Sequence, residues 1–442
     1  MPQGRIENLI NKNVKGGKPA ILGISVLGPK QQVKRFFGEA QAWGRNAKIL
    51  VATEIFWAIP MMWIFFYQTI FMREIGIDEV LIGLSMTLPL IFQVFFPMLG
   101  GYLADRFGRK RVIMFFDIVG WIGYPGTLFI AREFWQIIVA MTFQGLASTI
   151  FGVWQTYLIE DTKSRHRVSV FGFMRIVSIV ASLLTPMAGA LISNYGVEQG
   201  CRYIFLTSVV SNTIMFLIRQ ILLRESEIGK ILSSDNEISR PKSYIETLGI
   251  VAKHRDLLLL FTLSILGSMS GRLTVTFGPL YLTDLNTLAL NESIASIIPM
   301  ASSISSLVAL SFIVPKLKQS NVRKALLISY AIGFLGIIVL IIAPTGSMLL
   351  AVLSAVFDSA RYLAAFSILP VFLVNAIDEV DPFTKAKIMS LITTFSALVS
   401  WPIPAFGGYL YTIEPTYPFL FAAISLLICE GLLLPARANM TS

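Results

Sequence analysis

Three charged residues lie inside long apolar runs, where charge is rare, and they are the side chains of this sequence best placed to do chemistry. Asp358 and Arg361 stand three residues apart in one run, and Arg272 stands in another. Residues three apart in a helix lie one turn apart on nearly the same face. A carboxylate beside guanidinium groups in apolar surroundings can bind an ionic solute, or it can take up and release a proton.

The depth of these charges follows from the length of the runs, because about twenty apolar residues cross a bilayer as a helix. Asp358 lies about twelve residues from the expected outer end of its run, or roughly 18 Å at about 1.5 Å per residue. Arg272 lies at a similar depth, about fifteen residues from the inner end of its own run. We therefore expect Arg272, Asp358 and Arg361 to share one central polar cluster. The alternative is a static charge pair that holds two helices together.

The composition indicates a membrane protein. Hydrophobic residues make up 55% of the chain and charged residues only 14%, whereas about a quarter of the residues of soluble proteins are charged. The formal net charge is +10, but the cations stand in short loops between apolar runs, which argues against a nucleic-acid partner. The two histidines, His166 and His254, both fall in polar loops. No metal site, cofactor or histidine proton relay is expected.

The apolar runs predict an all-α membrane protein of twelve transmembrane helices in two pseudo-symmetric six-helix bundles. The expected spans are 49–72, 79–102, 112–131, 134–158, 168–193, 202–222, 257–282, 292–314, 325–343, 347–374, 387–411 and 417–435. Lys and Arg gather in one set of loops, at 106–111, 163–167 and 316–324. Cytoplasmic loops carry this excess, so both termini are expected in the cytoplasm.

The chain divides into five parts. Residues 1–48 are a polar tail, in which the stretch around Trp43 is either a helix on the membrane surface or solvated chain. Residues 49–222 form the first bundle, and residues 257–435 form the second. The charged stretch 223–256 is a cytoplasmic linker, and residues 436–442 form a C-terminal tail. The halves share a pattern: Ser178, Ser182, Pro186 and Gly189 match Ser396, Ser400, Pro404 and Gly407 in order and spacing.

A short cationic turn gives the most specific motif of the chain. It reads Gly101-Tyr102-Leu103-Ala104-Asp105-Arg106-Phe107-Gly108-Arg109-Lys110-Arg111 and lies between the second and third spans. It resembles the loop between the second and third helices of the major facilitator superfamily. The resemblance implies a latch that joins the halves on the cytoplasmic side when the cavity faces outward. Its expected members are Gly101, Asp105, Arg106, Gly108, Arg109 and Lys110, with Glu160 and Asp161 at the end of the fourth span. The alternative is that the cations only set the topology and bind anionic head groups.

The resemblance also implies a fold in which helices one, four, seven and ten surround a central cavity, so it puts Arg272, Asp358 and Arg361 there. Two proline–glycine stretches resemble the superfamily's antiporter helix incompletely. They predict bends at Pro186, Gly189, Pro404, Gly407 and Gly408, because proline removes a backbone hydrogen bond and glycine allows close packing. A tightly packed kinked helix is the plainer interpretation.

The fourth span departs from the drug–proton antiporters of the superfamily. Those proteins usually have an arginine three residues before a Gln-Gly pair, and here Met141 precedes Gln144-Gly145. Arg175 in the fifth span either replaces that cation or, as we slightly favour, reaches the cytoplasmic interface. Asp117 and Glu430 are interpreted as interface or packing residues.

Four further residues are candidates for substrate binding: Trp57, Gln68, Gln144 and Gln155. The aromatic residues of the first span suit an organic solute with a flat or apolar part, although lipid-facing anchoring explains any single one equally well. Glu54 in the same span either carries the coupling proton, together with Asp358, or extends to cytoplasmic water.

These residues predict a secondary active transporter for a small organic solute, with an organic anion or zwitterion favoured and proton coupling expected. Multidrug efflux of amphipathic compounds and a transporter-like sensor without transport are the alternatives, and uniport stays open. No spacing of residues supports a membrane enzyme, and no phosphate-binding loop of the nucleotide-binding type is present. The expected setting is the plasma membrane, with the protein as a monomer among anionic lipids.

Overall fold

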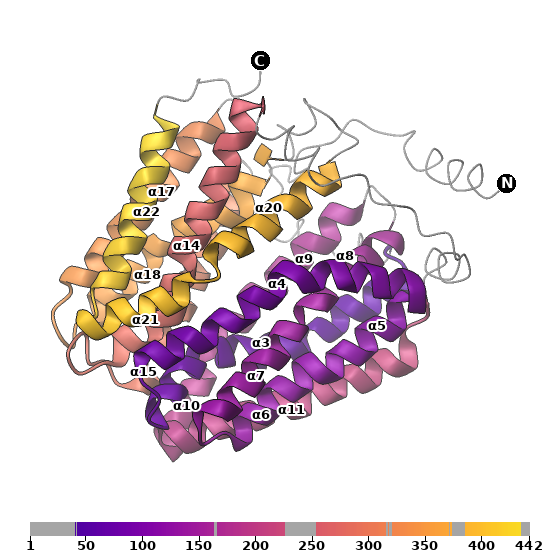
Figure 1. The fold of residues 1–442 in the computed structure, drawn as a ribbon, viewed down its shortest axis with the longest axis horizontal. Coiled ribbons are helices and arrows are strands. Elements are labelled where there is room, and N and C mark those ends of the chain that lie inside the picture. Colours follow the sequence, from indigo (N-terminus) through magenta and orange to yellow (C-terminus); the bar gives the residue numbers. More distant parts are fainter. Residues whose placement is uncertain are drawn as a thin grey trace.

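The computed structural model describes residues 42–162, 166–225, 253–314, 321–370 and 385–434, together with residues 40, 317, 372 and 373. Every regular element in this part of the chain is helical (Figure 1). Most of the predicted N-terminal tail, most of the predicted linker, the residues from 374 to 384 and the C-terminal tail lie outside the described residues.

The first half of the described chain runs from α3 to α11, with one π-helical segment, η1. The bounds are α3 Arg45–Glu74, α4 Glu79–Phe107, α5 Arg109–Phe116, η1 Asp117–Ile122, α6 Gly123–Ile130, α7 Phe134–Leu146, α8 Ser148–Glu160, α9 Arg167–Leu183, α10 Thr185–Tyr195 and α11 Val197–Leu222.

The second half runs from α14 to α22, with a second π-helical segment, η5. The bounds are α14 Arg255–Thr283, α15 Glu292–Ala295, α16 Ile297–Phe312, α17 Val322–Ile342, α18 Met348–Leu363, η5 Ala364–Ile368, α20 Lys385–Ser400, α21 Ile403–Ile413 and α22 Tyr417–Leu433.

The predicted fold class is confirmed. Ten helical stretches within the described residues are long and apolar enough to cross a membrane, and α22 is a shorter apolar helix. The remaining stretch is α18, which continues directly into η5. Grouped in this way, the described helices follow the order of the twelve predicted spans.

The cationic turn is shorter than the sequence predicts. The expected spans leave a break at residues 103–111, but α4 continues to Phe107 and α5 begins at Arg109. Gly108 alone makes the turn, with a φ of 92° that residues with a Cβ rarely adopt. Apolar length therefore placed the end of the second span too early, because the charged residues Asp105 and Arg106 belong to the last turn of α4.

The helices pack as two groups that meet along several helix pairs. Within the first half, α3 packs on α9 and α11, and within the second half α14 packs on α20 and α22. Across the halves, α4 packs on α20 and α21, α9 on α16, α10 on α15, and α3 on α14. Figure 1 shows the two groups as the indigo-to-magenta and the orange-to-yellow helices.

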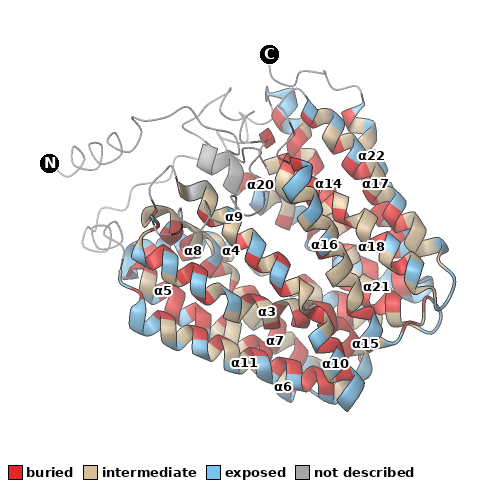
Figure 2. Cartoon of the chain, turned by 180° about the vertical axis from the view of Figure 1, so that it is seen from behind, coloured by how far each residue is buried: buried red, intermediate tan, exposed pale blue. Residues whose placement is uncertain are grey.

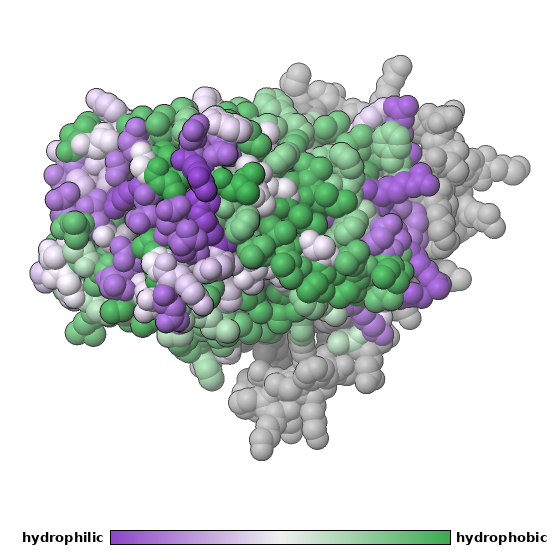
Figure 3. Space-filling model, turned by 90° about the horizontal axis from the view of Figure 1, so that it is seen from below, coloured by the Kyte–Doolittle hydropathy of each residue, from purple (hydrophilic) through white to green (hydrophobic). Residues whose placement is uncertain are grey.

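Many large apolar side chains face outward, as membrane-spanning helices require. Phe95, Phe115, Trp135 and Leu349 are each more than half exposed, and exposed faces alternate with buried ones along the helices (Figure 2). In Figure 3 a broad hydrophobic zone separates hydrophilic side chains at the two ends of the view. Exposed apolar surface of this extent marks a surface covered by lipid or protein. We call the end where α3 ends and α4 begins the outer end, and the end where α4 ends and α5 begins the inner end.

Candidate functional site

The bidentate pair of Asp358 and Arg361 lies at the centre of the candidate site. Arg361 Nε lies 2.8 Å from Asp358 Oδ1, and its Nη2 lies 2.8 Å from Oδ2. The same Nη2 donates to Thr274 Oγ1 at 2.8 Å. Arg361 is only 2% exposed. The pair forms because Asp358 and Arg361 stand three positions apart in α18. The bond to Thr274 joins α18 to α14.

Arg272 lies half-buried in α14, two residues before Thr274. Its Nη2 donates to Gln93 Oε1 at 3.1 Å, and Gln93 belongs to α4 of the other half. Within the described residues Arg272 has this neutral amide as its hydrogen-bond partner and no ion pair. The guanidinium therefore crosses the interface between the halves with its charge uncompensated by a described carboxylate.

Tyr362 connects these groups. Its ring centroid lies 4.5 Å from Arg361 Cζ, in a cation–π contact. The tyrosine also interacts electrostatically with Arg272 and with Arg175 of α9. Whether Arg175 replaces the missing cation of the fourth span or reaches the cytoplasmic interface stays a prediction. We call Gln93, Arg272, Thr274, Asp358, Arg361 and Tyr362 the central polar cluster.

The other candidate residues for substrate binding lie apart from these contacts. The Tyr124 hydroxyl donates to Gln68, and both are buried inside the first half. Trp57 packs edge-on against Trp121 at 5.2 Å between ring centroids. Gln144 in α7 and Gln155 in α8 are half-buried. Their roles in substrate binding stay predictions.

A second buried charge cluster lies within the first half. Arg219 of α11 pairs with Glu54 of α3 at 3.1 Å and with Asp117 of η1 at 3.3 Å. Arg219 is 3% exposed and Asp117 is 1% exposed. Glu54 therefore does not simply extend to water, and Asp117 is buried rather than at an interface.

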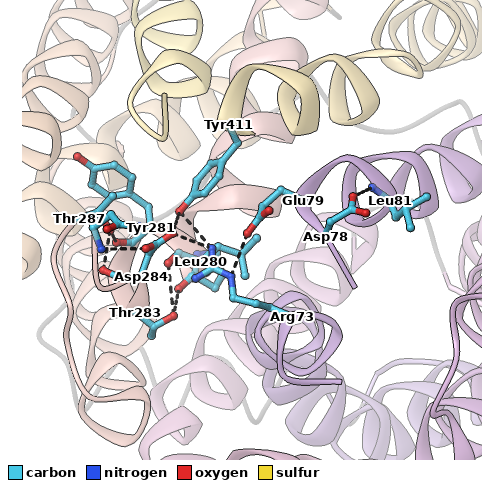
Figure 4. Close-up of polar contacts among 12 residues, drawn as sticks. Arg73, Asp78, Glu79, Leu81, Leu280, Tyr281, Thr283, Asp284, Thr287 and Tyr411 are labelled. Atoms are coloured by element: carbon cyan, nitrogen blue, oxygen red, sulfur yellow. Dashed lines mark hydrogen bonds and ion pairs between the residues drawn. The ribbon is translucent and has the colours of Figure 1, made fainter. Parts of the chain in front are cut away.

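An outer network of four polar residues joins the halves (Figure 4). Arg73, at the end of α3, pairs with Asp284, which follows α14, at 3.1 Å, and with Glu79 of α4 at 3.3 Å. The Tyr411 hydroxyl of α21 donates to Asp284 Oδ2 at 3.2 Å. Nearby, the Tyr67 hydroxyl donates to the Glu292 carbonyl at 2.9 Å. These bonds tie α3 to α14, α15 and α21 at the outer end, and Glu79 joins α4 to the network through Arg73.

Backbone contact reinforces this closure. A Cβ on Gly408 of α21 would lie 2.4 Å from the Glu79 carbonyl oxygen, and one on Gly189 of α10 would lie 2.3 Å from Ser296 Oγ. Each glycine thus permits a close approach between the halves. Pro186 lies in the first turn of α10, after α9 ends at Leu183. Pro404 lies in the first turn of α21 in the same way, with Gly407 one turn on. A helix divides at each of these proline positions.

The predicted latch residues bond inside the first half. Arg109 pairs with Glu160 at 2.6 Å and with Asp105 at 3.4 Å, and the Asp105 side chain is 60% exposed. Asp161 accepts from the Ala47 amide at the start of α3 at 3.0 Å. Arg106 donates to the Tyr102 hydroxyl, and Lys110 donates to the Gln220 carbonyl. Gly101 faces open space and Gly108 makes the turn.

Glu225, which the sequence assigned to the linker, caps α5 instead. Its two carboxylate oxygens accept from the amides of Arg109 and Lys110 at 3.0 Å each. The free amides and the dipole of a helix N-terminus favour a carboxylate there. This capping is a contact that the sequence analysis missed.

Sequence reasoning also missed Gln93, Asp284 and Arg219 as members of these clusters. In the sequence Arg73 is a single cation directly after the first expected span. A usable signal was present for the outer network, since Arg73 and Asp284 stand at the ends of the first and seventh spans, which are equivalent positions in the two halves. For Arg219 the sequence shows only a cation near the end of an apolar run, and such a cation equally well indicates a residue that sets the topology.

Comparison with known proteins gives a family match over most of the chain. The model of the Major Facilitator Superfamily matches residues 49–403. The chain is 26% identical over 260 residues to a Na(+), Li(+), K(+)/H(+) antiporter of Planococcus maritimus, covering 55% of this chain and 58% of that protein. It is 22% identical over 216 residues to the class H tetracycline resistance protein of Pasteurella multocida, covering 48% and 52%. The match thus spans just over half the length of these relatives.

Solved structures share the fold at low identity. The nucleoside transporter NupG superposes with a TM-score of 0.66 at 16% identity, covering 89% of this chain and all of that chain. A D-xylose-proton symporter superposes with a TM-score of 0.63 at 14% identity, covering 90% and 99%.

Proposed function

Because the chain belongs to the major facilitator superfamily, we propose that it is a secondary active transporter for a small organic anion or zwitterion. Two groups of helices that meet along a central interface support alternating access, in which the groups rock around a site near the middle of the membrane. The central polar cluster is the substrate site in this proposal. The protein works in the plasma membrane, as a monomer among anionic lipids, with both termini in the cytoplasm.

The hydrogen bonding of Arg272 is the observation that supports an anionic or zwitterionic substrate. Its guanidinium lies at the interface of the halves and donates to the Gln93 amide, while Asp358 neutralises Arg361. The three charges therefore sum to +1. A carboxylate or phosphate oxygen on the substrate would replace Gln93 and form an ion pair with Arg272, which adds the attraction between opposite charges to the hydrogen bond. A zwitterion would in addition place its cation against Asp358.

Proton coupling accounts for the membrane-embedded carboxyl groups of Asp358 and Glu54. Ionisable residues within membrane spans are rare and mark substrate and proton pathways. The similarity to a Na(+), Li(+), K(+)/H(+) antiporter supports this coupling.

The outer network fits one end of the transport cycle. With Arg73 paired to Asp284 and Glu79 at the outer end, the halves are held together there. At the inner end Asp105 is mostly exposed, and the described bonds of Arg109 and Asp161 stay within the first half. These contacts suit a conformation that faces inward. In the opposite conformation the outer network breaks and the latch around Asp105 engages the second half.

The test is uptake into proteoliposomes that contain the purified full-length protein. A panel of organic anions, zwitterionic amino acids and cationic dyes is offered with and without a pH gradient. Arg272→Gln should reduce anion uptake by about tenfold or more, the loss expected for a charge-assisted bond of roughly 1.5–3 kcal/mol. The matched control Arg132→Gln changes an exposed loop arginine and should leave uptake unchanged. Equal anion uptake by Arg272→Gln and the wild type would contradict the proposal.

Efflux of amphipathic drugs is the second candidate. It is favoured by the similarity to a tetracycline resistance protein and by the paired rings of Trp57 and Trp121. Dye transport that is insensitive to Arg272→Gln would select it over anion transport. A sensor without transport activity would bind a solute of the panel but would transport none of them.

A further inference from the structure

The buried charged residues Glu54, Asp117 and Arg219, here called the N-half charge cluster, are not part of the central polar cluster. Three helical segments contribute one residue each: α3 supplies Glu54, η1 supplies Asp117 and α11 supplies Arg219. Arg219 bonds both acids, and its Nε also donates to Thr53 Oγ1 at 3.0 Å. The arginine therefore links the first, third and sixth spans around one charge centre.

The charges of this cluster do not balance. Two carboxylates and one guanidinium sum to −1 when all three are ionised, and a buried unpaired charge is costly. Among the residues that the structure describes, the other elements packed on this cluster supply no second cation at this point. Helices α6 and α7 contain no charged residue, and the one charged residue of α8 is Glu160 at its end. The arginines and the lysine of α5 stand in its first turn, away from Asp117. Arg175 of α9 interacts with Tyr362.

Asp117 provides an independent sign of a missing ligand. Its Oδ2 bonds Arg219, but its Oδ1 is buried and has no hydrogen-bond partner within the described residues. A charged carboxylate oxygen that is buried without a hydrogen-bond partner costs the full free energy of its desolvation. A proton on Asp117 removes that charge.

The backbone at Asp117 is also unusual. The residue opens the π-helical segment η1, within a span that is otherwise α-helical. Such segments are rare and occur frequently at functional sites. Asn212 of α11 donates to the Trp121 carbonyl of the same segment at 2.9 Å. The irregular turn is thus held open by a side chain from the helix that carries Arg219.

We propose that Glu54 and Asp117 share one proton beside Arg219, and that this is the proton coupled to transport. Binding converts one carboxylate to a carboxylic acid and brings the cluster from −1 to neutral; release returns the proton to water. The Glu54 side chain is 14% exposed against 1% for Asp117, so the proton enters and leaves through Glu54. An alkali cation fits poorly, because it would lie against the fixed guanidinium between the two acids. The inference rests on the proposed proton-coupled transport and assigns its proton site.

Infrared spectroscopy of the purified full-length protein in lipid nanodiscs tests the proton site without any substrate. The wild type should show a protonated carboxyl band that disappears as the pH rises. Asp117→Asn and Glu54→Gln should each abolish that titration, because either amide leaves a neutral pair with Arg219. Glu414→Gln, which changes an exposed outer residue, should leave the band as in the wild type. A band that titrates identically in all four proteins would overturn the inference.

Two transport assays separate this inference from the proposed function. Uptake driven by a pH gradient should fall about tenfold or more in both variants, while exchange of labelled for unlabelled substrate should change less than about twofold. Unchanged gradient-driven uptake would overturn the inference and leave anion transport standing. A titration that shifts with added Na⁺, Li⁺ or K⁺ would overturn it in favour of an alkali-cation site. If no solute of the panel moves, the proposed function fails, and the infrared titration still decides whether the cluster holds a proton.

Discussion

Weakening the outer network should open the outer end of the protein, and Asp284→Asn is the most conservative way to do so. The substitution keeps the size of the side chain and leaves an amide oxygen to accept from the Asn286 backbone, as Asp284 Oδ1 does at 2.9 Å. It removes the charge that pairs with Arg73 at 3.1 Å. Arg73 keeps its pair with Glu79 inside the first half, so the loss falls on the contact between the halves.

The size of the effect follows from partial burial. The side chains of Arg73 and Asp284 are 26% and 13% exposed, which lies between a surface pair and a buried one. A surface pair contributes about 0–1 kcal/mol, and loss of a hydrogen bond to a charged group costs about 1.5–3 kcal/mol. We take about 1–2 kcal/mol, which shifts the ratio of open to closed outer ends by roughly 5–30-fold.

Distances between spin labels measure this ratio. Labelled cysteines at Glu74 and Leu285, which are both exposed, report the separation of the outer ends of α3 and α14. Double electron–electron resonance should show a larger long-distance population in Asp284→Asn than in the doubly labelled parent. Glu414→Gln on the same background controls for loss of an outer negative charge alone. A distance distribution that Asp284→Asn leaves unaltered would refute the assignment of the outer network as a gate.

Two further substitutions test the other clusters. Asp358→Asn leaves the buried Arg361 without its counter-charge, which costs about 3–5 kcal/mol. We expect this variant to lose proton-driven uptake and to have a lower melting temperature in differential scanning fluorimetry. Uptake and a melting temperature equal to those of the wild type would remove the pair from the mechanism. Asp105→Asn should slow turnover in the uptake assay with little change in the amount of protein inserted into the membrane. Wild-type turnover would leave the loop with only its role in topology.

Local patterns in the sequence predicted the parts of the structure that depend on neighbours in the chain. The spans follow from apolar length, because the bilayer fixes how many residues a helix needs to cross it. The contact of Asp358 with Arg361 follows from their spacing of three residues in one helix. The helix breaks at Pro186 and Pro404 follow from the missing amide of proline.

Contacts between distant segments could not be predicted in this way. Arg73 and Asp284 lie 211 residues apart in the sequence, and each stands at a helix end, where a charge normally faces water. Arg219 likewise stands near the end of a helix, and only the packing of α11 on α3 places it beside Glu54. Arg272 was expected in one cluster with Asp358 and Arg361, but spacing along the chain could not predict its bond to Gln93 across the interface of the halves.

Access to the central polar cluster from both sides is the most direct measurement of the mechanism. Ser268 lies one helical turn before Arg272 in α14 and is half-buried, and the two native cysteines, Cys201 and Cys429, are buried. A membrane-impermeant maleimide is applied to Ser268→Cys in right-side-out and in inverted vesicles, with and without a transported anion. Alternating access predicts labelling from both sides and protection by the anion. Labelling from neither side, or from one side only under all conditions, would contradict it.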